Sequence, residues 1–193
     1  MELLNNREEY LSRLAEIIAP KPVCMEIGVD NGAFSSQIYK ALNPKKLVLV
    51  DPFDTLTDPI SQADYYPTIH HRTVYSNETS YNHVNAIFEN EIADKRVFID
   101  RNLSVNAISN YKDKTFDFIY IDACHIYESV LWDIENYINK VKKGGFLGGH
   151  DYINHPSFGV IQAVNEFCTK HDYEIIMLVQ EGMCGDWLLS AKK

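Results

Sequence analysis

Apolar positions along the chain follow two different periods, and their alternation predicts a parallel sheet covered by helices. Short unbroken apolar runs are typical of strands buried on both faces, whereas apolar residues three and four positions apart indicate amphipathic helices. Runs and helical patterns follow one another along most of the chain. We predict strands over residues 23–27, 47–50, 96–99, 116–121, 146–149, 173–179 and 186–191, and helices over residues 3–18, 33–42, 80–92, 104–110, 127–141 and 160–170. The glycine pair Gly144 and Gly145 is expected to close the helix over residues 127–141.

This order of elements predicts an α/β fold of the Rossmann-like, three-layer type, with a mostly parallel sheet as the middle layer. The last two strands have no helix between them, so we expect them to be antiparallel. At 193 residues the chain has the length of one domain, and we take residues 1–193 as that domain. We interpret residues 1–20 as a helix that packs on the sheet or acts as a lid. Residues 52–78 show no period, so we interpret them as an insertion suited to a lid over the acceptor.

The first predicted strand leads into a loop that carries two glycines and two acids. Gly28 and Gly32 fit the strand–turn–helix unit that binds nucleotides, but Asp30 stands where a dinucleotide-binding loop has its middle glycine. A pyrophosphate would be repelled by Asp30 and by Glu26, which precedes the turn. Two carboxylates instead suit a ligand with an ammonium and a sulfonium group. We therefore expect S-adenosylmethionine here and disfavour an NAD-dependent oxidoreductase.

Acids also stand at the ends of later strands, where ligands bind in open α/β sheets. Asp51, which ends the second strand, is placed to accept hydrogen bonds from ribose hydroxyls. Asp122 and Asp151 end two neighbouring strands, and their mutual repulsion favours a cation between them. Mg²⁺ is preferred because it binds oxygen ligands. His125 is a candidate base for a hydroxyl group, although a histidine just before a helix also serves as a cap.

Composition narrows the class of partner. The formal net charge is −9 and the lysines and arginines are not clustered, which disfavours nucleic acid as a substrate. Four cysteines are scattered singly, as expected of reduced thiols in a reducing compartment. No apolar run approaches the length of about 20 residues that crosses a bilayer. We therefore expect a cytoplasmic protein with a small-molecule acceptor and no membrane partner, with homo-oligomerisation left open.

Three segments resemble class I S-adenosylmethionine-dependent methyltransferases. They are E-x-G-x-x-x-G from Glu26, D-A-C-H-x-Y-E from Asp122, and G-F-x-G-G-H-D-Y ending at Tyr152. Within this class the resemblance is greatest to the small group that includes macrolide-sugar O-methyltransferases and cephalosporin-hydroxylase-like proteins, and it covers about residues 20–190. It implies a seven-stranded sheet whose last strand is antiparallel.

The resemblance also implies roles for individual residues. Asp122 and Asp151 would bind Mg²⁺, and His125 would act as the catalytic base. The macrolide-sugar enzymes have a glutamate where this chain has His150, so we take His150 as a third metal ligand. Imidazole is a softer ligand than carboxylate, which leaves weak binding, a transition metal or no metal as alternatives. Asn102 is placed to contact the adenine. The predicted cofactor contacts are Glu26, Gly28, Asp30, Asn31, Gly32, Asp51, Asn102 and Asp122.

The expected activity is methyl transfer from S-adenosylmethionine to a hydroxyl of a sugar or another small molecule, assisted by a divalent metal ion and a histidine base. Two alternatives stay open at this point. A metal-independent enzyme of the same class would use Asp122 and Asp151 to orient His125 or the cofactor. A non-catalytic nucleotide-binding module would have no use for His125, which disfavours it.

Overall fold

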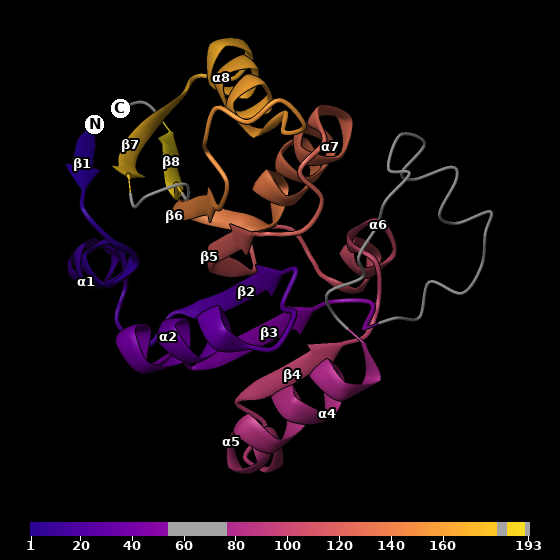
Figure 1. Ribbon diagram of the computed structural model, residues 1–193. Coiled ribbons are helices and arrows are strands. Elements are labelled where there is room, and N and C mark those ends of the chain that lie inside the picture. Colours follow the sequence, from indigo (N-terminus) through magenta and orange to yellow (C-terminus); the bar gives the residue numbers. More distant parts are fainter. Residues whose placement is uncertain (54–76, 181–184, 192–193) are drawn as a thin grey trace.

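The computed structural model describes residues 1–53, 77–180 and 185–191, and within these ranges the strands form one eight-stranded sheet (Figure 1). The strand order is β1-β7-β8-β6-β5-β2-β3-β4. The strands are β1 (Glu2–Leu4), β2 (Val23–Ile27), β3 (Lys46–Val50), β4 (Val97–Asp100), β5 (Phe116–Ile121), β6 (Val141–Gly149), β7 (Tyr173–Val179) and β8 (Trp187–Ala191). The helices are α1 (Arg7–Ile17), α2 (Ala33–Leu42), α4 (Glu78–Ile87), α5 (Glu89–Ala93), α6 (Ser104–Ala107), α7 (Tyr127–Tyr137) and α8 (Val160–Lys170), with 3-10 turns η1 (Ile108–Asn110) and η2 (Ile138–Lys140).

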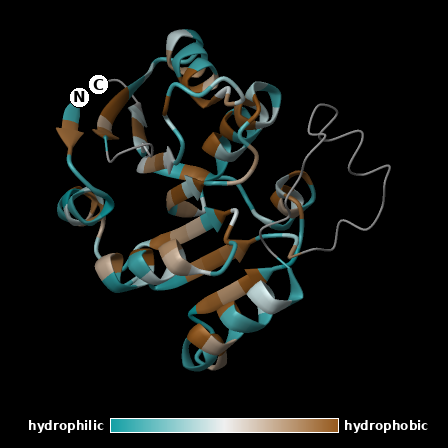
Figure 2. Ribbon diagram, viewed as in Figure 1, coloured by the Kyte–Doolittle hydropathy of each residue, from teal (hydrophilic) through white to brown (hydrophobic). Residues whose placement is uncertain are grey.

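Helices cover both faces of the sheet and give the molecule three layers. α1, α2 and α4 share one apolar cluster with alternate strand residues such as Phe118 and Tyr120. α6, α7 and α8 share a second cluster with the residues in between, such as Ile119 and Ile121. Because successive side chains of a strand point to opposite faces, the unbroken apolar end of β5 supplies both layers. Figure 2 shows the matching hydropathy, with hydrophobic stretches along β2 and β3 and mixed colouring on the helices.

The predicted Rossmann-like α/β sandwich with an antiparallel last strand is confirmed. β8 pairs antiparallel with both β6 and β7, and the other strand pairs of the described residues are parallel. The sheet has eight strands, one more than the seven expected, because residues 2–4 form an additional edge strand parallel to β7, with Leu4 opposite Val179. This pairing satisfies a sheet edge that would otherwise present free backbone groups.

The helix expected over residues 1–20 is therefore wrong at its start. α1 begins only at Arg7, after the extended backbone of Asn6, whose side chain accepts a hydrogen bond from the N–H of Glu9 at 2.8 Å. An asparagine that accepts in this way satisfies one of the free N–H groups of the first turn, so it fixes where the helix starts.

The helix predicted over residues 127–141 is too long at its end. α7 ends at Tyr137, one 3-10 turn follows, and β6 begins at Val141. Gly144 and Gly145, which we expected to close the helix, lie inside this strand. The left-handed backbone of Gly144, with φ +79°, lets the strand bend there, and a register shift against β5 accompanies it.

The parallel strands β2, β3, β5 and β6 end at one edge of the sheet. Backbone hydrogen bonds continue the pairing past the strand ends: the N–H of Asp122 donates to the C=O of Ile27 at 2.7 Å, and the N–H of His150 donates to the C=O of Ile121 at 3.0 Å. The loops that follow β2, β5 and β6 are therefore held side by side, as expected for a binding edge in this kind of sheet.

Most of the predicted insertion over residues 52–78 lies outside the described residues. Its far end meets α4, where the side chain of Asn77 accepts hydrogen bonds from the N–H groups of Thr79 and Ser80 and so begins the helix. In the described part of the chain, no helix has the length and hydrophobicity needed to cross a membrane.

Candidate active site

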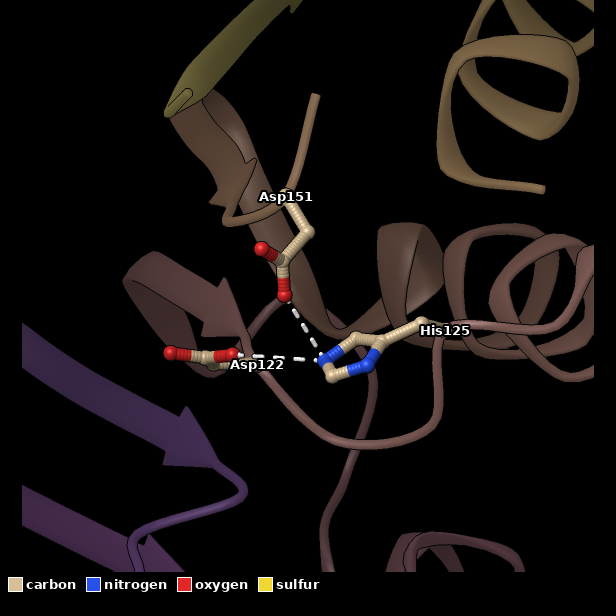
Figure 3. Close-up of side chains that lie close together, drawn as sticks. All are labelled: Asp122, His125 and Asp151. Atoms are coloured by element: carbon tan, nitrogen blue, oxygen red, sulfur yellow. Dashed lines mark ion pairs between the residues drawn. The ribbon is translucent and has the colours of Figure 1, made fainter. Parts of the chain in front are cut away.

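Two carboxylates and an imidazole converge at the ends of β5 and β6. Asp122 directly follows β5, Asp151 follows β6 one residue later, and His125 lies in the turn before α7. Figure 3 shows both carboxylates turned toward the imidazole, whose Nε2 lies 2.8 Å from Asp151 Oδ2 and 3.8 Å from Asp122 Oδ1. One donor atom from each residue lies within 4.8 Å of the other two, a spacing at which all three can reach one metal ion. Asp151 has the left-handed φ of +57°, a conformation that is uncommon outside glycine and often found at functional sites.

His150 adds a second imidazole to this cluster. Its Nδ1 lies 3.5 Å from Asp122 Oδ1 and 3.3 Å from Asp151 Oδ2. The backbone of His150 is held by Trp187, whose indole N–H donates to its carbonyl at 3.2 Å. The structure thus brings together the residues predicted as metal ligands, Asp122, His150 and Asp151, with the predicted base His125 beside them.

The four groups shift one another's pKa values strongly. Burial alone would lower the pKa values of His125 and His150, but the two carboxylates outweigh it and raise them to about 9 and about 10. Burial would raise the pKa of Asp122, yet the imidazoles bring it down to about 2, and they hold the pKa of Asp151 well below its usual range. In the protein alone, two imidazolium groups therefore neutralise the two carboxylates. A metal ion that binds here must displace these protons.

The glycine loop after β2 packs directly on the end of β5. Gly28 has φ +86°, and a Cβ atom at this position would lie 2.0 Å from the backbone oxygen of Asp122. A side chain is therefore excluded twice, by the backbone conformation and by the neighbouring strand. Gly32, the second glycine of the loop, stands at the N-terminus of α2 with φ +78°. The loop that was predicted to cradle the cofactor is thus fixed against the residue predicted to bind metal.

Asp51 holds this loop in shape. Its Oδ2 accepts hydrogen bonds from the N–H of Val29 at 2.8 Å and of Asp30 at 3.1 Å, and its Oδ1 accepts one from the N–H of Phe53 at 2.8 Å. The carboxylate is almost fully buried. We predicted a contact with ribose for Asp51, and the structure adds a supporting role that the sequence pattern did not indicate.

The other predicted cofactor residues occupy different depths. Glu26 is buried beneath the loop, accepts a hydrogen bond from Ser35 Oγ, and has its pKa raised to about 8, mainly by burial. Its carboxyl is therefore mostly neutral at pH 7 and does not reach the surface. Asp30 and Asn31 are exposed, and Asn31 Oδ1 accepts from the N–H of Ala33 at the start of α2. The exposed pair is better placed than Glu26 to touch a ligand.

Asn102 follows β4, next to the end of β3. Its side-chain amide donates to Asp100, which also accepts from the hydroxyl of Tyr111 at 2.6 Å. Because β3 and β4 are parallel neighbours, Asn102 lies at the same edge of the sheet as Asp51. This position is compatible with the adenine contact that we predicted.

Sequence reasoning missed Arg7. Its Nε lies 3.1 and 3.2 Å from the two carboxylate oxygens of Asp186, its Nη2 donates to the hydroxyl of Tyr120 at 3.1 Å, and the same Nη2 lies 3.7 Å from Asp122 Oδ2. The guanidinium lies over the ring of Phe34, 4.5 Å from its centre. Asp186, the main partner of Arg7, lies 179 positions away, so no local sequence pattern indicates the pair. The one available signal was a cation in the first turn of a helix, where the helix dipole disfavours it.

The strand order, the glycine loop and the acids at the strand ends define a Rossmann-like α/β protein with a ligand site at the carboxyl edge of its sheet. The family described as "Methyltransferase domain" matches residues 25–152, well over half of the chain and all three segments noted in the sequence. The chain belongs to this family and is an S-adenosylmethionine-dependent methyltransferase. The residues at the edge fit that cofactor, because Gly28 brings the loop against the end of β5 and the same loop leaves the polar side chains of Asp30 and Asn31 exposed.

Solved structures share the fold at low sequence identity. An O-methyltransferase from Bacillus cereus in complex with SAH is 14% identical, with 95% of this chain and 80% of that chain covered and a TM-score of 0.65. A putative rRNA methylase from Clostridium thermocellum is 9% identical, with 100% and 99% covered and a TM-score of 0.68. A ribosomal protein L11 methylase from Lactobacillus delbrueckii subsp. bulgaricus is 14% identical, with 98% and 81% covered and a TM-score of 0.59. No curated protein matches the chain. These neighbours share a fold and differ in acceptor, so the fold alone does not select the acceptor.

Proposed function

We propose that the protein methylates a hydroxyl group of a sugar or another small molecule, with a divalent metal ion at Asp122 and Asp151. The observation that carries this proposal is the convergence of two carboxylates and two imidazoles beside the glycine loop. A hydroxyl is a weak nucleophile near pH 7, so its methylation calls for a group that takes its proton and a group that stabilises the oxygen anion. The acidic net charge of −9 supports a small acceptor rather than a polyanion.

The donor set fits a metal ion. Asp122, Asp151 and His150 would hold it, with distances between donor atoms of 3.3 and 3.5 Å from His150 Nδ1 to the carboxylates. His125 Nε2 lies 2.8 Å from Asp151 Oδ2, so the imidazole that we take as the base borders the same two carboxylates. A bound ion would lower the pKa of an acceptor hydroxyl, and its charge would offset the carboxylates that raise the pKa of His125.

The remaining roles belong to the chain itself. The glycine loop and Asp51 would orient the cofactor, which supplies the methyl group. His125, once neutral, would accept the proton of the acceptor hydroxyl while that oxygen takes the methyl group from sulfur. Alignment of oxygen, methyl carbon and sulfur would supply much of the rate, because reactants held in line react as if highly concentrated. His125 and Asp122 are accordingly the residues that we assign to catalysis.

A metal-independent methyltransferase is the second candidate, and one observation favours it. His150 stands where a third carboxylate is expected from the resemblance, and two imidazolium groups balance the charge of the cluster without an ion. In this case Asp122 and Asp151 would orient His125. The acceptor would still be a small molecule. For either candidate we expect a cytoplasmic protein, and a homo-oligomer is compatible with both.

Calorimetric titration of S-adenosylmethionine, first with chelator and then with added Mg²⁺ or Mn²⁺, separates the two candidates. Metal-assisted transfer predicts cofactor binding without metal and a separate metal response that Asp122→Asn and Asp151→Asn abolish. Asp113→Asn is the matched control, because Asp113 is exposed and pairs only with Lys140 within the described residues. Transfer of labelled methyl to a panel of sugars and polyols then identifies the acceptor. Activity that is unchanged by chelator would overturn the metal-assisted mechanism and support the second candidate.

A further inference from the structure

The carboxylate of Asp122 has two sides that face different partners. Its Oδ1 faces His150 at 3.5 Å and His125 at 3.8 Å, which is the side assigned to the metal ion. Its Oδ2 faces Arg7, whose Nη2 lies 3.7 Å away. The second side thus presents a negative and a positive group next to each other, at the border of the glycine loop, because Gly28 packs on the backbone of the same aspartate.

Arg7 has hydrogen-bonding capacity that its neighbours do not use. Nε and Nη2 are engaged by Asp186 and Tyr120, whereas Nη1 donates to no group within the described residues. The side chain keeps a quarter of its surface exposed. Asp186 and the ring of Phe34 fix the guanidinium, so its remaining N–H groups are held in place before any ligand arrives. A guanidinium fixed in this way is well suited to bind a carboxylate.

The amino-acid end of the cofactor matches this pair of charges. An α-amino acid carries an ammonium and a carboxylate about 3 Å apart, a spacing similar to that between Arg7 and Asp122. We propose that Arg7 binds the α-carboxylate of the methionine part of S-adenosylmethionine while Asp122 Oδ2 receives its α-ammonium. The inference rests on the cofactor site described under the proposed function. It makes α1 part of the cofactor site and not only a packing helix.

A purely supporting role for Arg7 is the competing explanation. Arg7 neutralises the buried Asp186, and this alone would keep an arginine at the position. The two explanations differ in which ligands they affect. A supporting residue affects every ligand of the site alike, whereas a carboxylate-binding residue affects only ligands that carry a carboxylate.

The test compares S-adenosylhomocysteine with 5′-methylthioadenosine, which lacks the amino-acid end, by calorimetry in the presence of chelator. Arg7→Met should weaken the binding of S-adenosylhomocysteine at least tenfold and change that of 5′-methylthioadenosine by less than about twofold. Arg7→Lys, which keeps a positive charge, should bind S-adenosylhomocysteine with an affinity between those of the wild-type protein and Arg7→Met. Arg13→Met is the matched control on the same helix, because Arg13 is partly exposed and pairs with Glu2 and Glu16 away from the site; it should leave both affinities unchanged.

Equal losses for the two ligands in folded Arg7→Met would overturn the proposal and leave Arg7 as a supporting residue. If Arg7→Met does not fold, ligand binding to the wild-type protein still tests the proposal. It should bind the decarboxylated analogue of S-adenosylhomocysteine, which keeps the ammonium, at least tenfold more weakly than the parent, and equal affinities would overturn the proposal. Failure of wild-type protein to bind either S-adenosylhomocysteine or 5′-methylthioadenosine would instead refute the cofactor site itself.

Discussion

Replacement of Gly28 by alanine tests how the cofactor loop is fixed. In Gly28→Ala the new Cβ would lie 2.0 Å from the backbone oxygen of Asp122, 2.5 Å from its carbonyl carbon and 2.9 Å from the Cα of Ala123. All three atoms belong to the backbone, so no side-chain rotation relieves the contact. Either the loop or the end of β5 must move.

Gly144→Ala provides the matched comparison. Gly144 has φ +79°, close to the +86° of Gly28, but no atom within 4 Å of its virtual Cβ. Its replacement should cost about 1–2 kcal/mol of unfolding free energy, the strain of a left-handed backbone alone. Gly28→Ala should cost about 1–3 kcal/mol more, as overpacking of a close-packed region does.

The assay is urea unfolding of wild type and both variants, followed by far-UV circular dichroism, together with calorimetric binding of S-adenosylhomocysteine. We expect Gly28→Ala to lose at least tenfold in affinity, because the displaced loop no longer lies on the strand end, and Gly144→Ala to bind as wild type does. Equal unfolding costs for the two variants would refute the reasoning, since the contact with Asp122 would then add nothing.

Three further predictions concern buried carboxyl groups. Burial raises the pKa of Asp133 to about 7, so the folded protein retains a proton that the unfolded chain loses above about pH 4. The contribution of Asp133 to stability should fall by about 3 kcal/mol from pH 5 to pH 8, in addition to the falls that the raised pKa values of Glu26, His125 and His150 cause. Unfolding measured at both pH values should therefore show a fall that is about 3 kcal/mol smaller in Asp133→Asn than in wild type, and equal falls would contradict the raised pKa. Glu26→Gln should leave affinity for S-adenosylmethionine within about threefold at pH 7, because a carboxyl with a pKa of about 8 is already mostly neutral; a loss above tenfold would show that the ionised form contacts the cofactor. Asp51→Ala should lower the unfolding free energy by at least about 2 kcal/mol, because the loop N–H groups lose their acceptor, and an unchanged urea midpoint would contradict this role.

Much of the fold and the centre of the site followed from local patterns. Unbroken apolar runs mark the buried strands, and the rule that ligands bind at the carboxyl ends of parallel strands predicts that Asp122, Asp151 and His125 lie together. These features are local in sequence, or depend on a single topological rule. A single sequence is enough to predict such features, because they do not depend on which distant residues come into contact.

The missed features depend on contacts between distant parts of the chain. β1 is only three residues long, and its extended state comes from pairing with β7 and not from its own pattern. Arg7 owes its place to Asp186, near the other end of the described chain. Gly144 and Gly145 were interpreted as a helix end, because a pair of glycines gives the same signal there as in a bent strand.

The position of β8 in the sheet has a consequence for how the protein is made. β8 lies between β6 and β7, although the ribosome completes both of these strands before it reaches residue 187. Until β8 docks between them, β6 and β7 each have an unpaired strand edge that is open to other chains, and β1 has its partner β7 but no sheet to join. Asp186, which engages Arg7, emerges at the same late moment. The sheet and the ion pair between Arg7 and Asp186 are therefore completed together, so a chain that lacks β8 exposes unpaired strand edges and is a target for chaperones and proteases.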